Sequence, residues 1–358
     1  MDLSKEQIKM TKGLAIITMV VVHLFAKKGA DVYGTPLIWV KEGVPLVYYL
    51  GFLGGYCIPF YCYCTGYALF IQHRDMEKQL FYHKSLSRLI RFLLRFWLIV
   101  ILFTAIGFFF DRYGEIPGSF SKFLGNFFLL ENTYNGAWWF ASTYVFFSIL
   151  SPLFLNMVEK VDSRVLFILF GLLFAGYYLC NMMDLFETVP QQYYWKGFLI
   201  KKLSDLWYVS FFYVTGMIMA KEHLIWKIEK WVEKKLPDKR NVVILALLLA
   251  VSIAACVVEL SVSMYYLAVF YFICFQLLQK NSITKRFFMF FGKHSTNIWL
   301  VHMFFYLFIF KNLVFIVKYP VFIFAFMMLI CILCSYIIDF IYEKILFYVE
   351  KQNWNCQN

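Results

Sequence analysis

Long runs of apolar residues recur from one end of the chain to the other, separated by short polar segments. Each run holds about 18 or more mainly apolar residues, enough for a helix to cross the hydrocarbon core of a bilayer. We place ten such segments at residues 8–26, 46–71, 88–110, 138–158, 165–183, 203–220, 241–258, 262–279, 295–312 and 320–342. The alternation of period two that marks an outer-membrane barrel is absent. The pattern predicts an all-α, polytopic bundle of about ten transmembrane helices.

Composition supports the same class. Of the 358 residues, 62% are hydrophobic, 22% are aromatic and only 16% are charged, which excludes an ordinary soluble globular protein. The first apolar segment has no small-residue cleavage site after it, so we expect it to be retained as a helix. No second soluble domain is indicated. The sequence therefore predicts a single transmembrane domain over residues 1–358.

The distribution of positive charge predicts the orientation. With the N-terminus inside, most of the 34 lysine and arginine residues fall in segments on the inner side. This bias indicates that both termini are cytosolic. The net charge of +12 is then mainly a feature of the inner membrane face, where anionic lipids lie. It gives no support for a nucleic-acid partner.

Residues 221–240 form the longest inner loop. Apolar residues recur there at helical spacing between lysines and glutamates, until Pro237 ends the pattern. This predicts an amphipathic helix that lies on the inner leaflet as an anchor without a catalytic role. Eight of the nine cysteines fall inside predicted spans, and Cys62-Tyr63-Cys64 lacks the spacing of a structural zinc site. We predict neither a disulfide framework nor a metal.

The first span contains the strongest candidate for chemistry. Lys12 lies at its predicted cytosolic border and His23 follows eleven residues later, on the same helix face and about 16 Å further along the axis. An ionisable group within a membrane span is costly and indicates a functional site. A histidine can act as a general base near neutral pH. The alternatives are a packed, hydrogen-bonded His23 and a Lys12 that only anchors the helix.

A stripe of arginines precedes the third span. Arg88, Arg91 and Arg95 are spaced by three and four residues, so they share one helix face at the membrane border. Guanidinium groups match phosphate oxygens, which indicates a phosphorylated ligand approaching from the cytosol. The alternative is that they reach out to anionic lipid headgroups. Asp339, near the inner end of the last span, is expected to pair with one of the basic residues.

Two further segments carry polar residues next to aromatic ones. Trp138 and Trp139 follow Asn135 at a predicted outer border, where they could form an interfacial belt or the floor of a cleft for a hydroxyl-rich acceptor. Ser295 and His302 are seven residues apart in the ninth predicted span. They are expected to share a helix face and to serve either a structural or a catalytic role.

Taken together, these segments resemble the acyltransferase-3 family of integral-membrane acyltransferases. Lys12 and His23, with ten residues between them, resemble a family motif in which a basic residue is followed by ten residues and a histidine. The basic residue of that motif is usually arginine, and here it is lysine. This keeps the charge but loses the bidentate fork. The proline common after the arginines of the third span is missing. The matching segments lie in order over nearly the whole chain: Lys12–His23, Cys64–Tyr67, Arg88–Arg91, Asn135–Phe140 with Pro152, and Gly292–His302 with Trp299 in a tyrosine position.

The resemblance implies transfer of an acyl group, normally acetyl, from cytosolic acyl-CoA to a hydroxyl of a surface glycan. It makes His23 the catalytic base, assigns Lys12 to positioning, and places Arg88 and Arg91 at the CoA phosphates. Acetyl-CoA is a donor substrate, and no permanently bound cofactor is expected. The implied location is a bacterial plasma membrane. The alternative is a transporter or flippase for a small metabolite or lipid-linked sugar, although the paired broken helices typical of transporters are not found.

Overall fold

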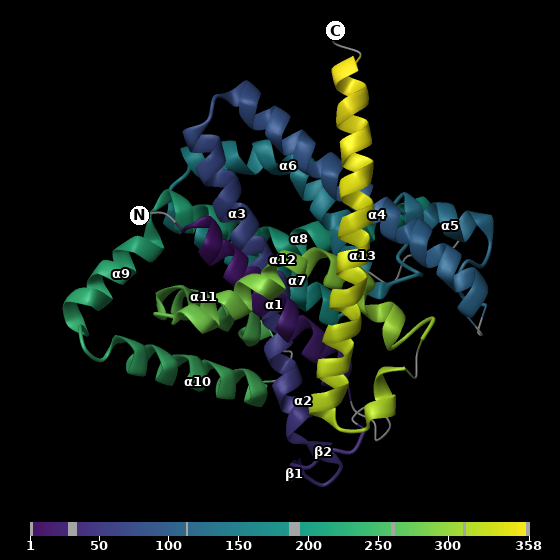
Figure 1. Ribbon diagram of the computed structural model, residues 1–358. Helices are drawn as coiled ribbons and strands as arrows, with labels where there is room; N and C mark the ends of the chain where they lie inside the picture. Colours follow the sequence, from purple (N-terminus) through teal and green to yellow (C-terminus); the bar gives the residue numbers. More distant parts are fainter. Residues whose placement is uncertain are drawn as a thin grey trace. The chain divides into compact units, whose positions relative to one another are not determined.

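The computed structural model describes residues 3–27, 34–111, 114–185, 194–258, 262–310 and 313–355, and it is 82% helical (Figure 1). A short antiparallel hairpin pairs β1 with β2. The elements are α1 Lys5–Phe25, β1 Trp39–Lys41, β2 Val44–Pro45, α2 Leu46–Gly51, η2 Phe52–Tyr56, α3 Cys57–Asp75, α4 Lys78–Phe110, α5 Phe120–Phe127, η3 Gly136–Trp138, α6 Trp139–Lys160, α7 Ser163–Met182, α8 Tyr194–Lys221, α9 Leu224–Lys235, α10 Arg240–Val258, α11 Val262–Leu277, α12 Ser282–Val301, η5 His302–Phe305, η6 Val314–Val317 and α13 Pro320–Asn355.

Within the described residues, six helical segments are long and apolar enough to cross a membrane. They are Lys5–Phe25, Lys78–Phe110, Gly136–Lys160, Ser163–Met182, Trp195–Lys221 and Pro320–Phe347. Two shorter apolar helices cover Arg240–Cys256 and Tyr265–Leu277. The predicted all-α membrane protein is confirmed. The count of ten spans, the cytosolic termini and the single domain over residues 1–358 stay predictions.

The chain forms two compact units, and the described residues divide between them. The first unit draws on Met1–Tyr33, Leu37–Ser85 and Ser142–Lys293. The second draws on Gly34–Pro36, Leu86–Ala141 and His294–Asn358. Helices α4, α6 and α12 each begin in one unit and end in the other.

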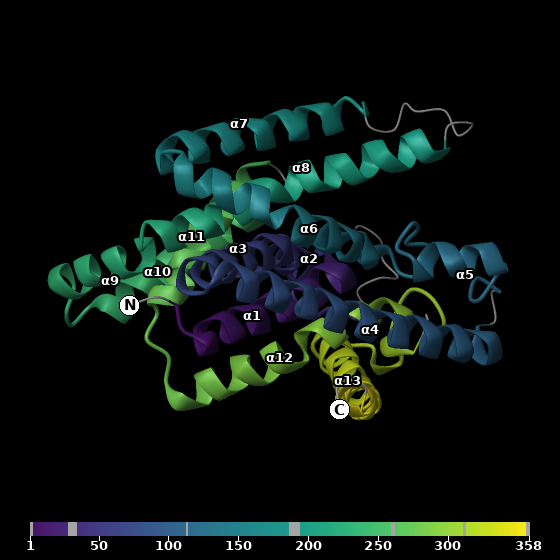
Figure 2. The ribbon, with the colours of Figure 1, turned by 90° about the horizontal axis from the view of Figure 1, so that it is seen from above.

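In the first unit, α3 packs along α8 by a close backbone approach. A Cβ atom at Gly66 would lie 2.1 Å from the carbonyl oxygen of Tyr213, and one at Gly216 would lie 2.4 Å from that of Tyr63. Only glycine permits this reciprocal contact, which is the small-residue packing expected where helices associate in lipid. Helix α7 runs beside α8, so α8 lies between two helices (Figure 2).

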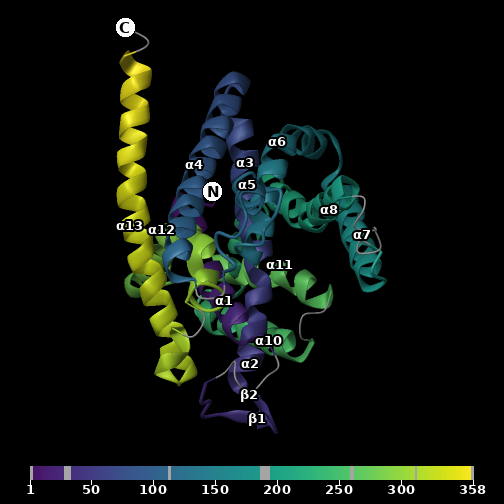
Figure 3. The ribbon, with the colours of Figure 1, turned by 90° about the vertical axis from the view of Figure 1, so that its right-hand side faces the viewer.

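Two predicted spans are not single helices. Residues 46–71 divide into α2, the 3₁₀ helix η2 and α3, and η2 packs against α1. The predicted span at 295–312 is wrong in its bounds, because α12 ends at Val301 and η5 follows. The prediction that Ser295 and His302 share the face of one α-helix is therefore also wrong. In the second unit, α13 forms a long continuous helix that starts at Pro320 (Figure 3), a residue favoured at the first helical position.

The predicted amphipathic segment contains the helix α9. Ile225 and Val232 are buried, whereas Trp226 and Trp231 are 41% and 58% exposed. The structure therefore has a helix within residues 221–240 that has a buried and an exposed side. Its role as an amphipathic anchor and its position on the inner leaflet stay predictions.

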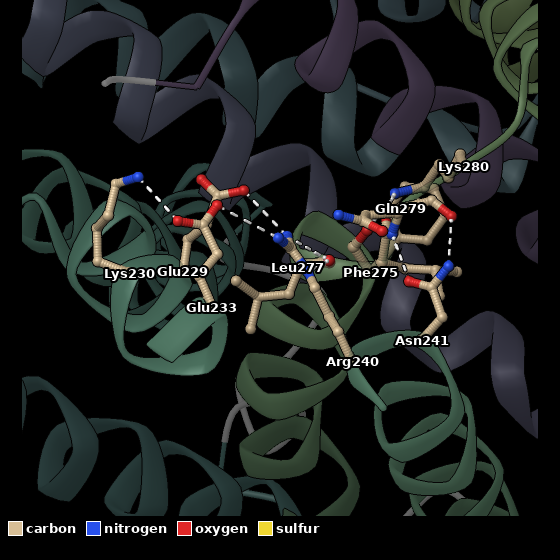
Figure 4. Close-up of polar contacts among 10 residues, drawn as sticks. Glu229, Lys230, Glu233, Arg240, Asn241, Phe275, Leu277, Gln279 and Lys280 are labelled. Carbon is tan, nitrogen blue, oxygen red and sulfur yellow. Dashed lines mark hydrogen bonds and ion pairs between the residues drawn. The ribbon is translucent and has the colours of Figure 1, made fainter. Parts of the chain in front are cut away.

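Buried Arg240 fixes α9 to the start of α10 and the end of α11 (Figure 4). One of its terminal nitrogens lies 3.0 Å from Glu229 and the other 3.5 Å from Glu233. The same guanidinium donates from two nitrogens to the carbonyl oxygen of Leu277, at 2.9 and 2.7 Å. The last carbonyl groups of a helix lack helical hydrogen-bond partners. Arg240 donates to one of them at the end of α11 and at the same time pairs with two glutamates of α9.

Candidate active site

Lys12 and His23 belong to the first unit, on α1. This helix is unbroken from Lys5 to Phe25, so the shared face predicted for the two residues is retained, with about 16 Å between their positions along the axis. Ser4 caps its start through a reciprocal capping box with Gln7. Both candidate side chains are partly buried.

Neighbouring helices hold α1 closely on either side of Lys12. A Cβ atom at Gly13 would lie 2.0 Å from the carbonyl oxygen of Phe288, and one at Gly292 would lie 2.0 Å from that of Lys9. The backbones of α1 and α12 therefore touch where the two glycines face each other. This contact gives Gly292, the first residue of the Gly292–His302 segment, a packing role.

Buried hydrogen bonds also fix the rotation of α1. Gln276 Nε2, on α11, donates to Thr11 Oγ1 at 2.8 Å, and Thr11 Oγ1 donates to the carbonyl oxygen of Gln7 at 2.9 Å. The N–H of Leu3 donates to Tyr67 Oη on α3 at 3.1 Å. A helix held at these points cannot turn freely, so the face that carries Lys12 and His23 has a defined direction.

The arginine stripe begins the part of α4 in the second unit, and its members have different environments. Arg91 is exposed and Arg88 is partly buried. Arg95 Nη1 donates to Asp339 Oδ1 at 2.5 Å and to Asn297 Oδ1 at 2.9 Å. Arg95 is thus the basic partner of Asp339. The sequence predicted that such a partner exists but did not identify it. Arg95 is held inside the protein by an ion pair, which distinguishes it from Arg91.

This ion pair is part of a larger polar network between α12 and α13. Asn297 Nδ2 donates to Asp339 Oδ1 at 2.9 Å and to Ser335 Oγ at 2.8 Å. His294 Nδ1 lies 2.8 Å from Ser335 Oγ. His294, Asn297 and Ser335 were not predicted as site residues, although Ser335 precedes Asp339 by one helical turn and shares its face. Ser295, which was predicted, is also buried here.

Asn135 and Trp138 lie against the end of α12. Asn135 Nδ2 and Trp138 Nε1 both donate to the carbonyl oxygen of Leu300, at 2.9 and 3.0 Å. The last carbonyls of a helix lack helical partners, and these two side chains supply donors. Trp138 is fully buried, so the interfacial-belt alternative is wrong for it. Trp139 is partly exposed.

His302 is fully buried directly after α12. Its Nδ1 lies 2.8 Å from the carbonyl oxygen of Trp299, and Trp299 Nε1 donates to the carbonyl oxygen of Ala137 at 3.2 Å. The Trp299 ring packs against Phe92 and Phe140, with centroids 6.1 and 5.5 Å apart. Three segments distant in sequence therefore meet in the second unit.

The described residues include no group of three or more histidine, cysteine, aspartate or glutamate side chains placed to hold a metal ion. The eight cysteines in the described ranges are free thiols. The chemistry available in these ranges comes from imidazole, ammonium, guanidinium and carboxylate groups.

Two lysines in the cluster of Figure 4 have opposite electrostatic environments. Burial, together with repulsion from Lys285 and Arg240, lowers the pKa of Lys280 to about 8. The ammonium of Lys280 donates to the carbonyl oxygens of Phe275 and Leu278 at the end of α11. A hydrogen bond from exposed Lys230 to Glu233 raises the pKa of Lys230 instead.

These environments predict a difference in reactivity. Only the neutral amine is nucleophilic, so acetylation of Lys280 by acetic anhydride should increase with pH around a midpoint of about 8. Lys230 should require a pH above the ordinary lysine range of about 10.4. Peptide mass spectrometry after brief labelling at a series of pH values measures both. A Lys280 midpoint equal to or above that of Lys230 would contradict the assignment.

These units define a class of protein: a multi-pass helical membrane protein with charged networks among its helices. The chain belongs to the acyltransferase-3 family, since its sequence matches the family model, described as an acyltransferase domain, over residues 6–339. The resemblance predicted from the ordered segments is thereby confirmed. Family membership supports the activity of a membrane acyltransferase. No curated protein and no solved structure gives a significant match to the chain.

Proposed function

We propose that this protein transfers an acyl group, acetyl in the simplest case, from cytosolic acyl-CoA to a hydroxyl of an extracytoplasmic or membrane-associated acceptor. A cell-surface polysaccharide or its precursor is the proposed acceptor. The observation that carries the proposal is the family match over residues 6–339. The proposed location is a bacterial plasma membrane. Both termini are proposed to be cytosolic, because the distribution of basic residues favours that orientation.

The proposed reaction uses His23 as a general base. Its neutral imidazole takes the proton from the acceptor hydroxyl while the hydroxyl oxygen bonds to the carbonyl carbon of the thioester. The resulting tetrahedral intermediate collapses as the carbon–sulfur bond breaks. His23 then returns the proton to the departing CoA thiolate. Lys12, on the same face of α1, would help to position the donor or the base.

The arginine stripe supports the donor part of the proposal. Arg88 and Arg91 would contact the CoA phosphates, because Arg91 is exposed and guanidinium groups bind phosphate by two hydrogen bonds. Arg95 would contribute indirectly, since its ion pair with Asp339 fixes the direction of α4. This division of roles differs from the expectation that all three arginines of the stripe bind a phosphorylated ligand.

The acceptor side is proposed to use the segment at residues 135–139. The hydrogen bonds of Asn135 and Trp138 to Leu300 favour a supporting role for both, and Trp139 keeps exposed ring surface for an acceptor. Ser295 and His302 are buried, which favours structural roles.

The donor can be tested directly on purified protein in detergent. Acetyl-CoA at millimolar concentration should raise the midpoint of thermal unfolding, because a ligand that binds only the folded state stabilises it. Pantetheine without the nucleotide phosphates serves as the control and should give a smaller shift. An unchanged midpoint with acetyl-CoA, together with unmodified envelope polymers by mass spectrometry, would favour the transporter alternative.

A further inference from the structure

Helix α8 carries two charged residues whose side chains are mostly buried, within a segment able to span a membrane. Lys202 and Asp205 lie in Trp195–Lys221, and the side chain of Lys202 is only 9% exposed. Charged groups in such a segment are expensive, and they commonly mark a pathway or binding site. The proposed roles of His23, Lys12 and the arginines use neither residue, so the pair needs its own explanation.

The pair is incompletely satisfied. Lys202 Nζ donates to Ser142 Oγ on α6 at 2.6 Å. The same nitrogen is 4.0 Å from Asp205 Oδ2, too far for a hydrogen bond. Within the described residues, no donor reaches this buried carboxylate oxygen. Buried polar atoms normally have a partner, and a carboxylate acceptor beside an ammonium donor is suited to the hydroxyl groups of a ligand.

Each member of the pair has an aromatic ring near it. The centroid of the Phe198 ring is 5.6 Å from Lys202 Nζ. Tyr177 of α7 is close enough to Asp205 for an electrostatic interaction, and its ring meets Trp207 edge to face at 6.1 Å. The apolar face of an aromatic ring can pack against the C–H groups of a sugar ring. A carboxylate can accept hydrogen bonds from the sugar hydroxyls, and an ammonium group can donate to them.

We propose that Lys202, Asp205 and Ser142 bind a neutral, hydroxyl-rich sugar ring of the acceptor. The two formal charges cancel, which favours a neutral ring over an anionic one. This inference rests on the proposed acyl transfer for its biological meaning. It also matches the proposed orientation: Ser142 is near the start of α6 and Lys202 near the start of α8, helices that would both begin at the outer face.

Saturation-transfer NMR on the purified full chain tests the site. The probes are methyl glycosides of glucose, galactose and N-acetylglucosamine, with methyl glucuronide as the anionic comparison. We expect wild type to bind at least one neutral glycoside more tightly than the glucuronide. Asp205→Asn and Lys202→Met should weaken this binding about tenfold or more, the cost of a lost hydrogen bond to a charged group. Lys201→Met removes an exposed neighbouring charge and should bind as wild type.

The outcomes separate this inference from the proposed function. Wild type that binds no neutral glycoside, or variants that bind as wild type does, overturns the sugar site. Should either variant lose the acetyl-CoA-dependent thermal shift, Ser142→Ala decides instead, because it removes only a hydroxyl; it should also weaken sugar binding. Sugar binding that depends on Lys202 and Asp205, in a protein that acetyl-CoA never stabilises, would refute the donor proposal and leave the sugar site in place.

Discussion

Replacement of His23 by alanine should lower the rate of acyl transfer by about 10²–10⁴-fold, the usual contribution of a general base. The variant should still be stabilised by acetyl-CoA, because the proposed phosphate contacts lie on α4 and not on α1. Transfer is measured as the acetyl content of envelope polymers by mass spectrometry and as release of CoA thiol in vitro.

His223→Asn is the matched control for loss of an imidazole. His223 is exposed between α8 and α9 and has a φ of 49°, a backbone conformation that asparagine accepts. This variant should transfer at the rate of wild type. Acetylation that continues unchanged in the His23→Ala protein would rule out His23 as the base.

The second large effect concerns stability. Arg95→Met should destabilise the folded protein by about 3 kcal/mol, because it leaves the Asp339 carboxylate largely buried without its cation. Arg91→Met should change stability little, since Arg91 is exposed, but should reduce the thermal shift caused by acetyl-CoA. Thermal unfolding of each variant, with and without acetyl-CoA, separates the two effects.

A second substitution tests whether the ion pair is the cause. Asp339→Asn in the Arg95→Met background removes the uncompensated charge, so the double variant should recover part of the lost stability. Equal destabilisation by Arg95→Met and Arg91→Met would show instead that the two arginines have similar structural roles.

Much of the helical framework was predictable from the apolar runs, because the length of a run decides whether it can cross a bilayer. The positions where the helices are interrupted or end were not predictable in this way. Residues 46–71 remain apolar throughout, yet the chain changes to a 3₁₀ helix at Phe52–Tyr56, where it packs against α1. The end of α12 at Val301 depends likewise on tertiary donors from Asn135 and Trp138, which hydropathy does not report.

The candidate site shows the same division. The spacing of Lys12 and His23 depends only on helix geometry, and the unbroken α1 retains it. The partner of Asp339 depends on how α4 and α13 pack, so the sequence could predict that a partner exists but could not identify Arg95. Lys202 was missed because it follows Lys201 just before the predicted span at 203–220, where lysines are common, and the sequence does not show that Ser142 lies beside it.

The contacts that build the second unit also constrain when it can form. The carbonyl of Leu300 receives donors from residues 165 and 162 positions earlier, and Arg95 pairs with a carboxylate 244 positions later. While the ribosome is still producing the middle of the chain, α4 already carries Arg95 with no Asp339 to neutralise it. The second unit is therefore completed only after synthesis of α13. Until then Arg95 has no carboxylate partner and Trp138 is not covered, and exposed groups of this kind promote aggregation and degradation of a nascent protein.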